Sequence, residues 1–478
     1  MADEYVIEDK KKQLLVIVII CLVGFLVTYD YASLNISLSV IASHFKVRLI
    51  DVAWLPTIYL LIITSLLLGF GKLADIVGYK KIFLVGVSGF AVGGFLCAIS
   101  PTFHTLLLAR TFQSCGQAVY SPMEIVLITA FLPQNIRGRA FGLYAMFQGF
   151  GMVAGSLLGG YINSVLNWRY NFVFSITAGI FVVLLSLKVL PWKHIPPAEK
   201  RFDLPGAALL FFALGALLYA VNSMSKPVFD HLAVFSFAAA SLILFAVFFF
   251  REKTAPAPLL DLKLFKNLDF TFSVGALFLV MALVIGFIFL FPFYLEMVRS
   301  LDIAKAGLIM TFPSVLMMLI APVAGILSDR MGCRRICVAG AALILVAFIM
   351  LSFVGQNSPD ALIALALLFL GMGMGLFIAP NNKLVMGHVP AGRHGVGSGV
   401  YKICANAGSS MGLAVLVLIT SQIILFNAAK MHILFAEVRE HPDIAITGFR
   451  GAFAFGVLLS VIALVLASLA KDAPQHGE

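Results

Sequence analysis

Three ionisable side chains lie deep inside long apolar stretches of the sequence: Asp30, Arg110 and Glu124. Each costs at least about 2.5–3.5 kcal/mol at the centre of a membrane helix, so each is expected to have a role. A carboxyl group in a low-dielectric setting can exchange a proton near neutral pH, whereas an arginine stays charged. Asp30 and Arg110 therefore predict a proton-coupling pair, with a permanent structural ion pair as the alternative. Glu124 is either a second proton site or a ligand for a cationic substrate, with a solvated cavity residue as the alternative.

The composition places these residues in a membrane. Of the 478 residues, 61% are apolar and 12% are charged, and the mean hydropathy is +1.03. Soluble globular chains carry about 25% charged residues. The figures exclude a disordered protein, a coiled coil and a set of soluble domains, and they predict an all-α polytopic membrane protein. The net charge of +10 comes from basic residues scattered in short loops, which is typical of cytoplasmic loops and not of nucleic-acid binding.

The elements that must position the three charges are membrane-spanning helices. A helix needs about 20 mostly apolar residues to cross the hydrocarbon core of a bilayer. Fourteen such runs are predicted, at residues 14–41, 50–73, 82–100, 104–132, 138–163, 170–190, 205–223, 231–250, 269–297, 304–327, 336–355, 361–386, 398–425 and 449–470. Asp30 lies in the first run. Arg110 and Glu124 lie in the fourth, about 21 Å apart along the helix axis.

The distribution of basic residues predicts the orientation of the chain. With the N-terminus inside, the inside segments contain 20 Lys and Arg residues and the outside segments contain nine. This excess follows the positive-inside rule and predicts that both termini are cytoplasmic.

Two loops repeat the same pattern of glycine, aspartate and basic residues. GKLADIVGYKK (71–81) follows the second run, and GILSDRMGCRR (325–335) follows the tenth. Eight spans separate the loops, so both face the same side and the repeat is parallel. The aspartate can accept hydrogen bonds from the basic pair or from a neighbouring helix N-terminus, and glycines allow tight turns and close contact. The pattern predicts a gate made of Gly71, Asp75, Gly78, Lys80 and Lys81 together with Gly325, Asp329, Arg330, Gly332, Arg334 and Arg335.

These loops resemble the signature loop of the major facilitator superfamily. The first copy has Ile76 where the family usually has arginine, and the second copy has Arg330 at that place. Fourteen spans resemble the drug:proton antiporter branch of that superfamily. The resemblance implies a major facilitator fold, with two six-helix bundles plus two extra helices between them. The corresponding division is residues 1–190, 191–260 and 261–478.

Other motifs of the branch are matched inside the helices. Asp30 and Asn35 resemble its Asp-x-x-x-x-Asn pattern, and Arg110, Gln113 and Gly116 resemble its Arg-x-x-Gln-x-x-Gly pattern. The glycine-rich antiporter motif of the fifth helix is matched at Gly142, Gly151, Gly155 and Gly159, with Ser156 in place of the motif proline. The resemblance implies proton coupling through Asp30 and Arg110, while Ser156 makes the usual helix kink less expected.

The expected function is a proton-coupled secondary exporter of amphipathic drug-like or cationic compounds that works by alternating access. Export of an anionic metabolite or siderophore, lipid or lysolipid translocation, and import are the alternatives. The expected substrate cavity includes Asn35, Gln113, Phe147, Gln148, Glu296, Asn382 and Lys383. Lys383 and Lys402 are read either as structure at the cytoplasmic end or as a basic lining, and Glu296 with Arg299 as rim charges or an external gate.

No enzyme signature accompanies these features. All nine histidines fall in loops, termini or helix ends, and the sequence has no catalytic cluster, so an enzyme is disfavoured. It has no P-loop either, which disfavours an ATP-driven pump. A channel is disfavoured because it does not need two gate motifs. We expect no metal, no cofactor and no nucleic-acid partner. The expected partners are a small-molecule substrate, protons and the lipid bilayer, and the expected form is a monomer in the cytoplasmic (inner) membrane of a prokaryote.

Overall fold

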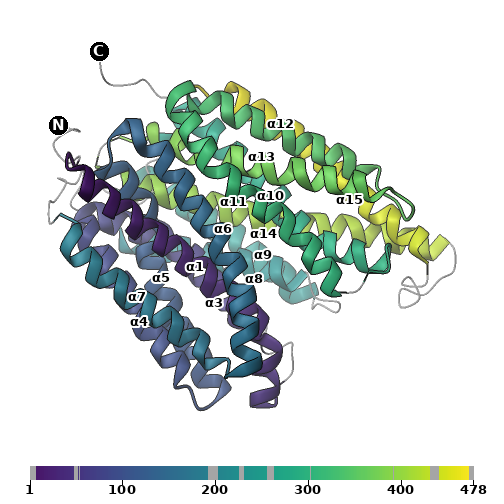
Figure 1. Cartoon of the computed structure of the whole chain (residues 1–478), viewed down its shortest axis with the longest axis horizontal. Coiled ribbons are helices and arrows are strands. Elements are labelled where there is room, and N and C mark those ends of the chain that lie inside the picture. The colour runs from purple at the N-terminus through teal and green to yellow at the C-terminus, as the bar shows by residue number, and fades with distance from the viewer. Residues whose placement is uncertain are drawn as a thin grey trace.

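The protein is built from long α-helices (Figure 1). The computed structural model describes residues 7–47, 52, 54–191, 203–224, 231–255, 263–301, 303–390, 392–430 and 441–472. The described ranges contain no β-strand. The α-helices are α1 (Lys10–Phe45), α3 (Trp54–Val77), α4 (Tyr79–Ala98), α5 (Phe103–Phe131), α6 (Gln134–Val165), α7 (Arg169–Val189), α8 (Leu204–Met224), α9 (His231–Thr254), α10 (Leu268–Met297), α11 (Ile303–Met331), α12 (Cys333–Ser352), α13 (Asp360–Gly387), α14 (His394–Lys430) and α15 (Pro442–Leu469), and a 3₁₀ turn η2 (Leu264–Lys266) precedes α10.

Each of the fourteen predicted spans corresponds to one of these helices. Twelve of the described helices are long and apolar enough to cross a membrane. The other two are α5, which carries the buried polar residues Arg110, Gln113, Gln117 and Glu124, and α8, whose apolar stretch is the shorter Leu204–Leu217. The expected all-α membrane architecture is therefore confirmed.

The helices form two groups that meet along two seams. In the N-terminal group α1 packs on α6 and α7, while α5 packs on α3 and α4. In the C-terminal group α10 packs on α14 and α15, while α13 packs on α11 and α12. The groups meet where α6 contacts α11 and where α3 contacts α14. Below, α1–α7 are called the N-terminal half and α10–α15 the C-terminal half. The division at residues 190 and 260 stays a proposal.

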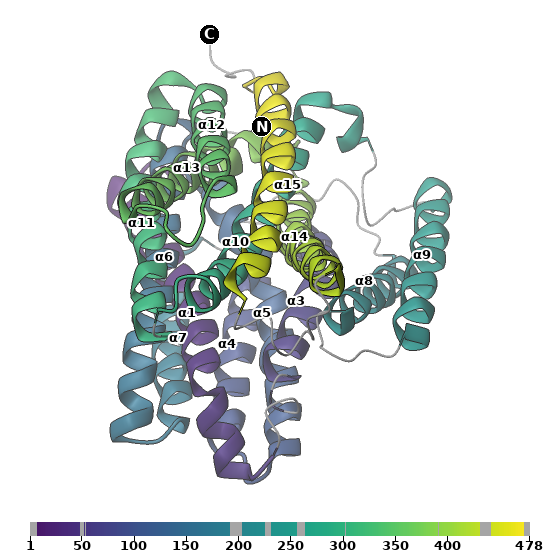
Figure 2. The same cartoon turned by 90° about the vertical axis from the view of Figure 1, so that its right-hand side faces the viewer.

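The two additional helices lie at the edge of the second seam. α8 and α9 form an antiparallel pair, and α8 contacts both α3 and α14 (Figure 2). Asp203 and Arg251 join the ends of this pair through a salt bridge of 2.7 Å. Asp203 also accepts a hydrogen bond from the backbone N–H of Gly206 in the first turn of α8. The burial of Asp203 opposes its ionisation, but the hydrogen bonds from Arg251 and Gly206 lower its pKa below the ordinary value.

The two repeated loops lie at one end of the molecule, which we call the motif end. Gly78 and Gly332 occupy equivalent turns in them with φ of 109° and 87°, a conformation that favours glycine. Both ends of the described chain are also there: the N–H of Ile7 donates to the carbonyl of Phe131, and the N–H of Cys333 donates to Asp472. An even number of spans requires this arrangement.

Candidate functional site

Asp30 is held in a buried polar cluster inside the N-terminal half. Its side chain is 2% exposed, and that of Arg110 is completely buried. Arg110 Nη1 donates to Asp30 Oδ2 over 2.7 Å and to Gln113 Oε1 over 2.6 Å. Gln113 Nε2 and the hydroxyl of Ser175 donate to the other oxygen of Asp30 over 3.2 and 3.4 Å. One carboxylate therefore ties α1 to both α5 and α7.

Arg110 keeps unused hydrogen-bonding capacity in this cluster. Within the described part of the chain, its Nε and Nη2 atoms are buried without a hydrogen-bond partner. The guanidinium lies 4.2 Å from the centre of the Tyr59 ring, which supplies a cation–π contact instead. The positive charge of Arg110 is therefore balanced mainly by Asp30, because the guanidinium has few other polar partners.

The helical period of α5 carries this polar face towards the motif end. Gln117, two turns after Arg110, accepts a hydrogen bond from the hydroxyl of Tyr59. Glu124, two turns further, accepts one from the hydroxyl of Tyr144 on α6. Spacings of three, four and seven residues keep these side chains on one face of a helix. The face links the two predicted acidic sites through one helix.

Glu124 has a cationic partner on the other half of the protein. Lys402 Nζ on α14 donates to Glu124 Oε2 over 2.5 Å and to the hydroxyl of Ser121 over 2.7 Å. The Glu124 side chain is completely buried, and that of Lys402 is 16% exposed. Gln148 on α6 donates to the Tyr144 hydroxyl over 2.9 Å and completes the group. Lys402 is therefore part of an ion pair that joins α14 to α5 across the two halves.

The repeated aspartates accept backbone N–H groups across the two seams. Asp75 accepts the backbone N–H groups of Gly395 and Val396, at the start of α14, over 2.8 and 3.0 Å. Asp329 accepts those of Gly138 and Arg139, the fifth and sixth residues of α6, both over 2.8 Å. A carboxylate at a helix N-terminus is stabilised by unpaired N–H groups and by the helix dipole. Asp75 therefore binds the N-terminus of α14, one of the two partners that the sequence suggested, whereas Asp329 binds N–H groups in the second turn of α6.

Lys383 contacts the second of these aspartates. Its ammonium donates to Asp329 Oδ1 over 2.6 Å and to the carbonyl of Ser328 over 3.3 Å. These contacts place Lys383 beside Asp329 at the motif end, and its assignment to the substrate cavity stays a prediction.

Two basic residues of the predicted gate bind carbonyl groups at helix C-termini, and the others are exposed. Lys80 is buried and donates to the carbonyls of Leu187 and Leu190 at the end of α7. Arg334 donates in the same manner to the carbonyl of Ser468 at the end of α15. Both therefore satisfy carbonyls at helix C-termini. The remaining basic residues of the predicted gate, Lys81, Arg330 and Arg335, are exposed.

Glycines let the halves approach backbone to backbone at the motif end. A Cβ on Gly71 would collide with the carbonyl of Gly395, and one on Gly325 with the carbonyl of Gly138. On α6, a Cβ on Gly142 would lie 2.5 Å from the carbonyl oxygen of Ala321 on α11. These contacts are between halves, so they require that the motif end is closed.

The other glycines of the predicted antiporter motif contact α1 instead. Cβ atoms on Gly151, Gly155 and Gly159 would collide with Phe25, Tyr29 and Ser33, respectively. Ser156 is exposed and donates to the carbonyl of Met152 over 3.2 Å, within an uninterrupted α6. The glycine face is therefore a packing surface for the helix that carries Asp30.

The remaining predicted cavity residues do not gather in one place. Asn35 is exposed and donates to the carbonyl of Tyr31, and Phe147 packs edge-on against Phe150. Asn382 is buried, and its Oδ1 atom has no partner among the described residues. Glu296 is half-buried near the opposite end of the molecule. Their assignment to a substrate cavity stays a prediction.

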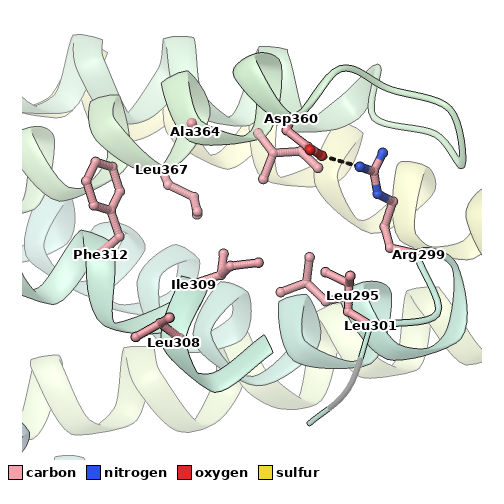
Figure 3. Close-up of a pocket in the computed structure, with 10 residues that line it drawn as sticks. Leu295, Arg299, Leu301, Leu308, Ile309, Phe312, Asp360, Ala364 and Leu367 are labelled. Carbon is pink, nitrogen blue, oxygen red and sulfur yellow. Dashed lines mark hydrogen bonds and ion pairs between the residues drawn. The ribbon is translucent and has the colours of Figure 1, made fainter. Parts of the chain in front are cut away.

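A pocket lies at the end opposite the motif end, in the C-terminal half. Its volume is about 440 Å³, and it is lined mainly by leucine, isoleucine and phenylalanine side chains of α10, α11 and α13 (Figure 3). At its mouth Arg299 forms an ion pair with Asp360 and donates to the carbonyls of Gln356 and Ser358. The partner of Arg299 is thus Asp360, which the sequence reading did not single out, and not the neighbouring Glu296.

Known proteins match this arrangement in sequence and in fold. Residues 20–413 match the family model described as Major Facilitator Superfamily. The chain is 32% identical to the riboflavin transporter RibZ of Clostridioides difficile, with 87% of this chain and 90% of that protein covered. It is 28% identical to the multidrug resistance protein Stp of Mycobacterium tuberculosis, with 85% and 75% covered. The crystal structure of the human organic anion transporter MFSD10 has a TM-score of 0.64 at 13% identity, covering 96% of this chain and 100% of that one, which is a likeness of fold.

Proposed function

Because this chain belongs to the Major Facilitator Superfamily, whose members carry small molecules across membranes, we propose that it is a proton-coupled secondary exporter of amphipathic drug-like or cationic compounds. It is an integral membrane transporter and not an enzyme, because its family and its relatives are transporters. The observation that carries the proton coupling is the buried cluster around Asp30.

Protonation of Asp30 would change how α1 is held. The ionised carboxylate accepts hydrogen bonds from Arg110, Gln113 and Ser175, and thereby joins three helices. A proton on this group removes its charge and one acceptor site, so the tie between α1 and α5 weakens. The glycine face of α6 packs on the same helix, and α6 also forms one of the two seams. Protonation of Asp30 is therefore coupled to α1 and α6, the pair of helices that must move.

The closed motif end suggests the direction of the cycle. The excess of basic residues supports a cytoplasmic motif end, with both termini cytoplasmic, in the inner membrane of a prokaryote. With Asp75 and Asp329 accepting backbone N–H groups across the seams, the described state is then closed to the cytoplasm. In an exporter this state releases the substrate and takes up the proton. We propose that a monomer performs this cycle.

The test is proton-driven transport by purified protein in liposomes with an imposed pH gradient. Ethidium serves as the cationic probe. We expect Asp30→Asn to keep substrate binding and lose the dependence of transport on the gradient, whereas Asp443→Asn, a matched change at an exposed position of α15, behaves as wild type. Gradient-driven transport by Asp30→Asn at the wild-type rate would remove Asp30 from the mechanism.

Riboflavin transport is a second candidate, favoured by the 32% identity to the riboflavin transporter of Clostridioides difficile. The same liposomes distinguish the two, because riboflavin is neutral and fluorescent whereas ethidium carries a fixed charge. Selective movement of riboflavin would replace the drug-export proposal. An organic anion and a lysolipid added to the panel test the remaining alternatives.

A further inference from the structure

The ion pair between Glu124 and Lys402 joins the two halves inside the protein. Glu124 lies on α5 and Lys402 on α14, 278 positions later in the chain. All the hydrogen bonds that Glu124 accepts, from Lys402 and Tyr144, go to Oε2. Oε1 is buried and has no partner among the described residues. The carboxylate is therefore incompletely satisfied even when the lysine is in place.

The pair lies on the part of α14 that must move when the motif end opens. Gly395, whose N–H binds Asp75, is seven residues before Lys402, about 10 Å along the helix. Four residues after Lys402, Asn406 donates to Thr64 on α3 over 3.1 Å. All three contacts join α14 to the N-terminal half. Separation of the halves at the motif end therefore carries Lys402 away from Glu124.

After this separation Glu124 lacks a cation. Its remaining partner is the Tyr144 hydroxyl, on the same half, and no other ion pair of Glu124 exists among the described residues. A buried carboxylate without a counter-charge is costly, so the open state favours any cation that reaches it. Gln148, one turn after Tyr144 on α6, donates to the Tyr144 hydroxyl over 2.9 Å, which places an amide and the aromatic ring of Tyr144 beside the carboxylate.

We propose that Lys402 is a tethered counter-cation that competes with the substrate for Glu124. When the motif end is open, Glu124 binds the cationic nitrogen of an amphipathic aromatic monocation. When the motif end closes, the ammonium of Lys402 returns to Glu124 and displaces the bound cation towards the opposite side. This inference rests on the proposed export function, and it adds the charge class of the substrate, the residue that binds it and the means of release.

The test measures ethidium binding by fluorescence anisotropy with the full-length protein in lipid nanodiscs. Lys402→Met removes the competitor while nearly keeping the side-chain length, so we expect at least a tenfold gain in ethidium affinity and at least a tenfold loss of ethidium turnover in liposomes. Lys402→Arg restores a cation and should reverse most of the gain. Lys430→Met is the matched control, because Lys430 is exposed at the far end of the same helix.

A second set of variants separates competition from general loosening. Glu124→Gln combined with Lys402→Met removes both charges and leaves no unpaired ion, so the double variant should fold and should not gain affinity for ethidium. Riboflavin, as a neutral probe, should bind Lys402→Met and wild type equally. An unchanged ethidium affinity in Lys402→Met, or an equal gain for riboflavin, would overturn the proposal.

The outcome is independent of proton coupling. If Asp30→Asn still responds to the pH gradient but Lys402→Met gains ethidium affinity, the proposed coupling site is wrong and the tethered cation stands. If Asp30→Asn uncouples transport but Lys402→Met binds ethidium as wild type does, the exporter stands and the tethered cation is wrong.

Discussion

Replacing Asp75 by asparagine should open the motif end. The carboxylate accepts two N–H groups from the other half, Gly395 at 2.8 Å and Val396 at 3.0 Å, and it is 6% exposed. Hydrogen bonds to a charged group contribute about 1.5–3 kcal/mol each. Asparagine keeps one acceptor oxygen and presents an N–H₂ group to the other N–H, so about one such bond is lost. At 1.4 kcal/mol per factor of ten, the ratio of closed to open molecules should fall about 10- to 150-fold.

Hydrogen exchange measured by mass spectrometry reports this opening directly. In wild type, the amides at 394–400 and at 134–142 are protected in part by Asp75 and Asp329, respectively. The two aspartates lie on opposite seams of the same two halves. If the halves separate as bodies, Asp75→Asn must raise exchange in both segments, including the one that it does not touch.

The result that refutes this reasoning is equally specific. Faster exchange at 394–400 alone would mean that Asp75 is a local helix cap and not part of a common closure. Unchanged exchange in both segments would mean that the backbone contacts of the glycines hold the motif end without the carboxylate. Asp443→Asn serves as the control for the change of residue type, and Asp329→Asn should reproduce the double effect from the other seam.

Three further predictions concern separate parts of the molecule. Arg110→Ala leaves the buried carboxylate of Asp30 without its cation and should lower the free energy of unfolding by about 3–5 kcal/mol. The thermal midpoint in detergent should therefore fall, and an unchanged midpoint would contradict this prediction. Gly142→Ala places a Cβ against the α11 backbone and should weaken closure by about 1–3 kcal/mol, with faster exchange at 134–142, whereas Gly160→Ala on the same helix, with no atom within 4 Å, should have no effect. Because its pKa is lowered in the folded state, Asp203 contributes stability above its unfolded pKa of about 3.9, and this is lost as the pH falls through the folded value. The difference in thermal midpoint between wild type and Asp203→Asn should therefore be present at pH 7 and be lost as the pH falls through the folded pKa of Asp203, and a constant difference would exclude the Arg251 pair as its cause.

Much of the architecture could be predicted because the bilayer imposes simple rules. Apolar length gave fourteen spans, and a helix is present at each of them. The glycine–aspartate repeat likewise placed two equivalent turns at one end, since Gly78 and Gly332 need a positive φ. Both signals are local in the sequence, so no knowledge of packing is required to read them.

The partners of the charged residues could be predicted only in part. The family resemblance implies that Asp30 and Arg110 act together, and in the structure Arg110 Nη1 lies 2.7 Å from Asp30 Oδ2. Arg299 was read with its neighbour Glu296, but its ion pair is with Asp360 on another helix. For Lys383 the sequence allows structure at the cytoplasmic end or a basic lining, and it does not reveal the ion pair with Asp329. Proximity in sequence is a poor guide here, because helices put distant residues side by side.

The strongest contrast is between the charges and their partners. That Asp30, Arg110 and Glu124 need partners follows from sequence alone, because an isolated charge in an apolar helix is costly. Which partner each has is decided by packing. Asp75 and Asp329 bind backbone N–H groups, which every residue except proline carries and which no motif reveals. The pairing of Glu124 with Lys402 exists only because α5 and α14, from different halves, meet at the closed motif end. It therefore depends on the state of the protein as well as on its fold.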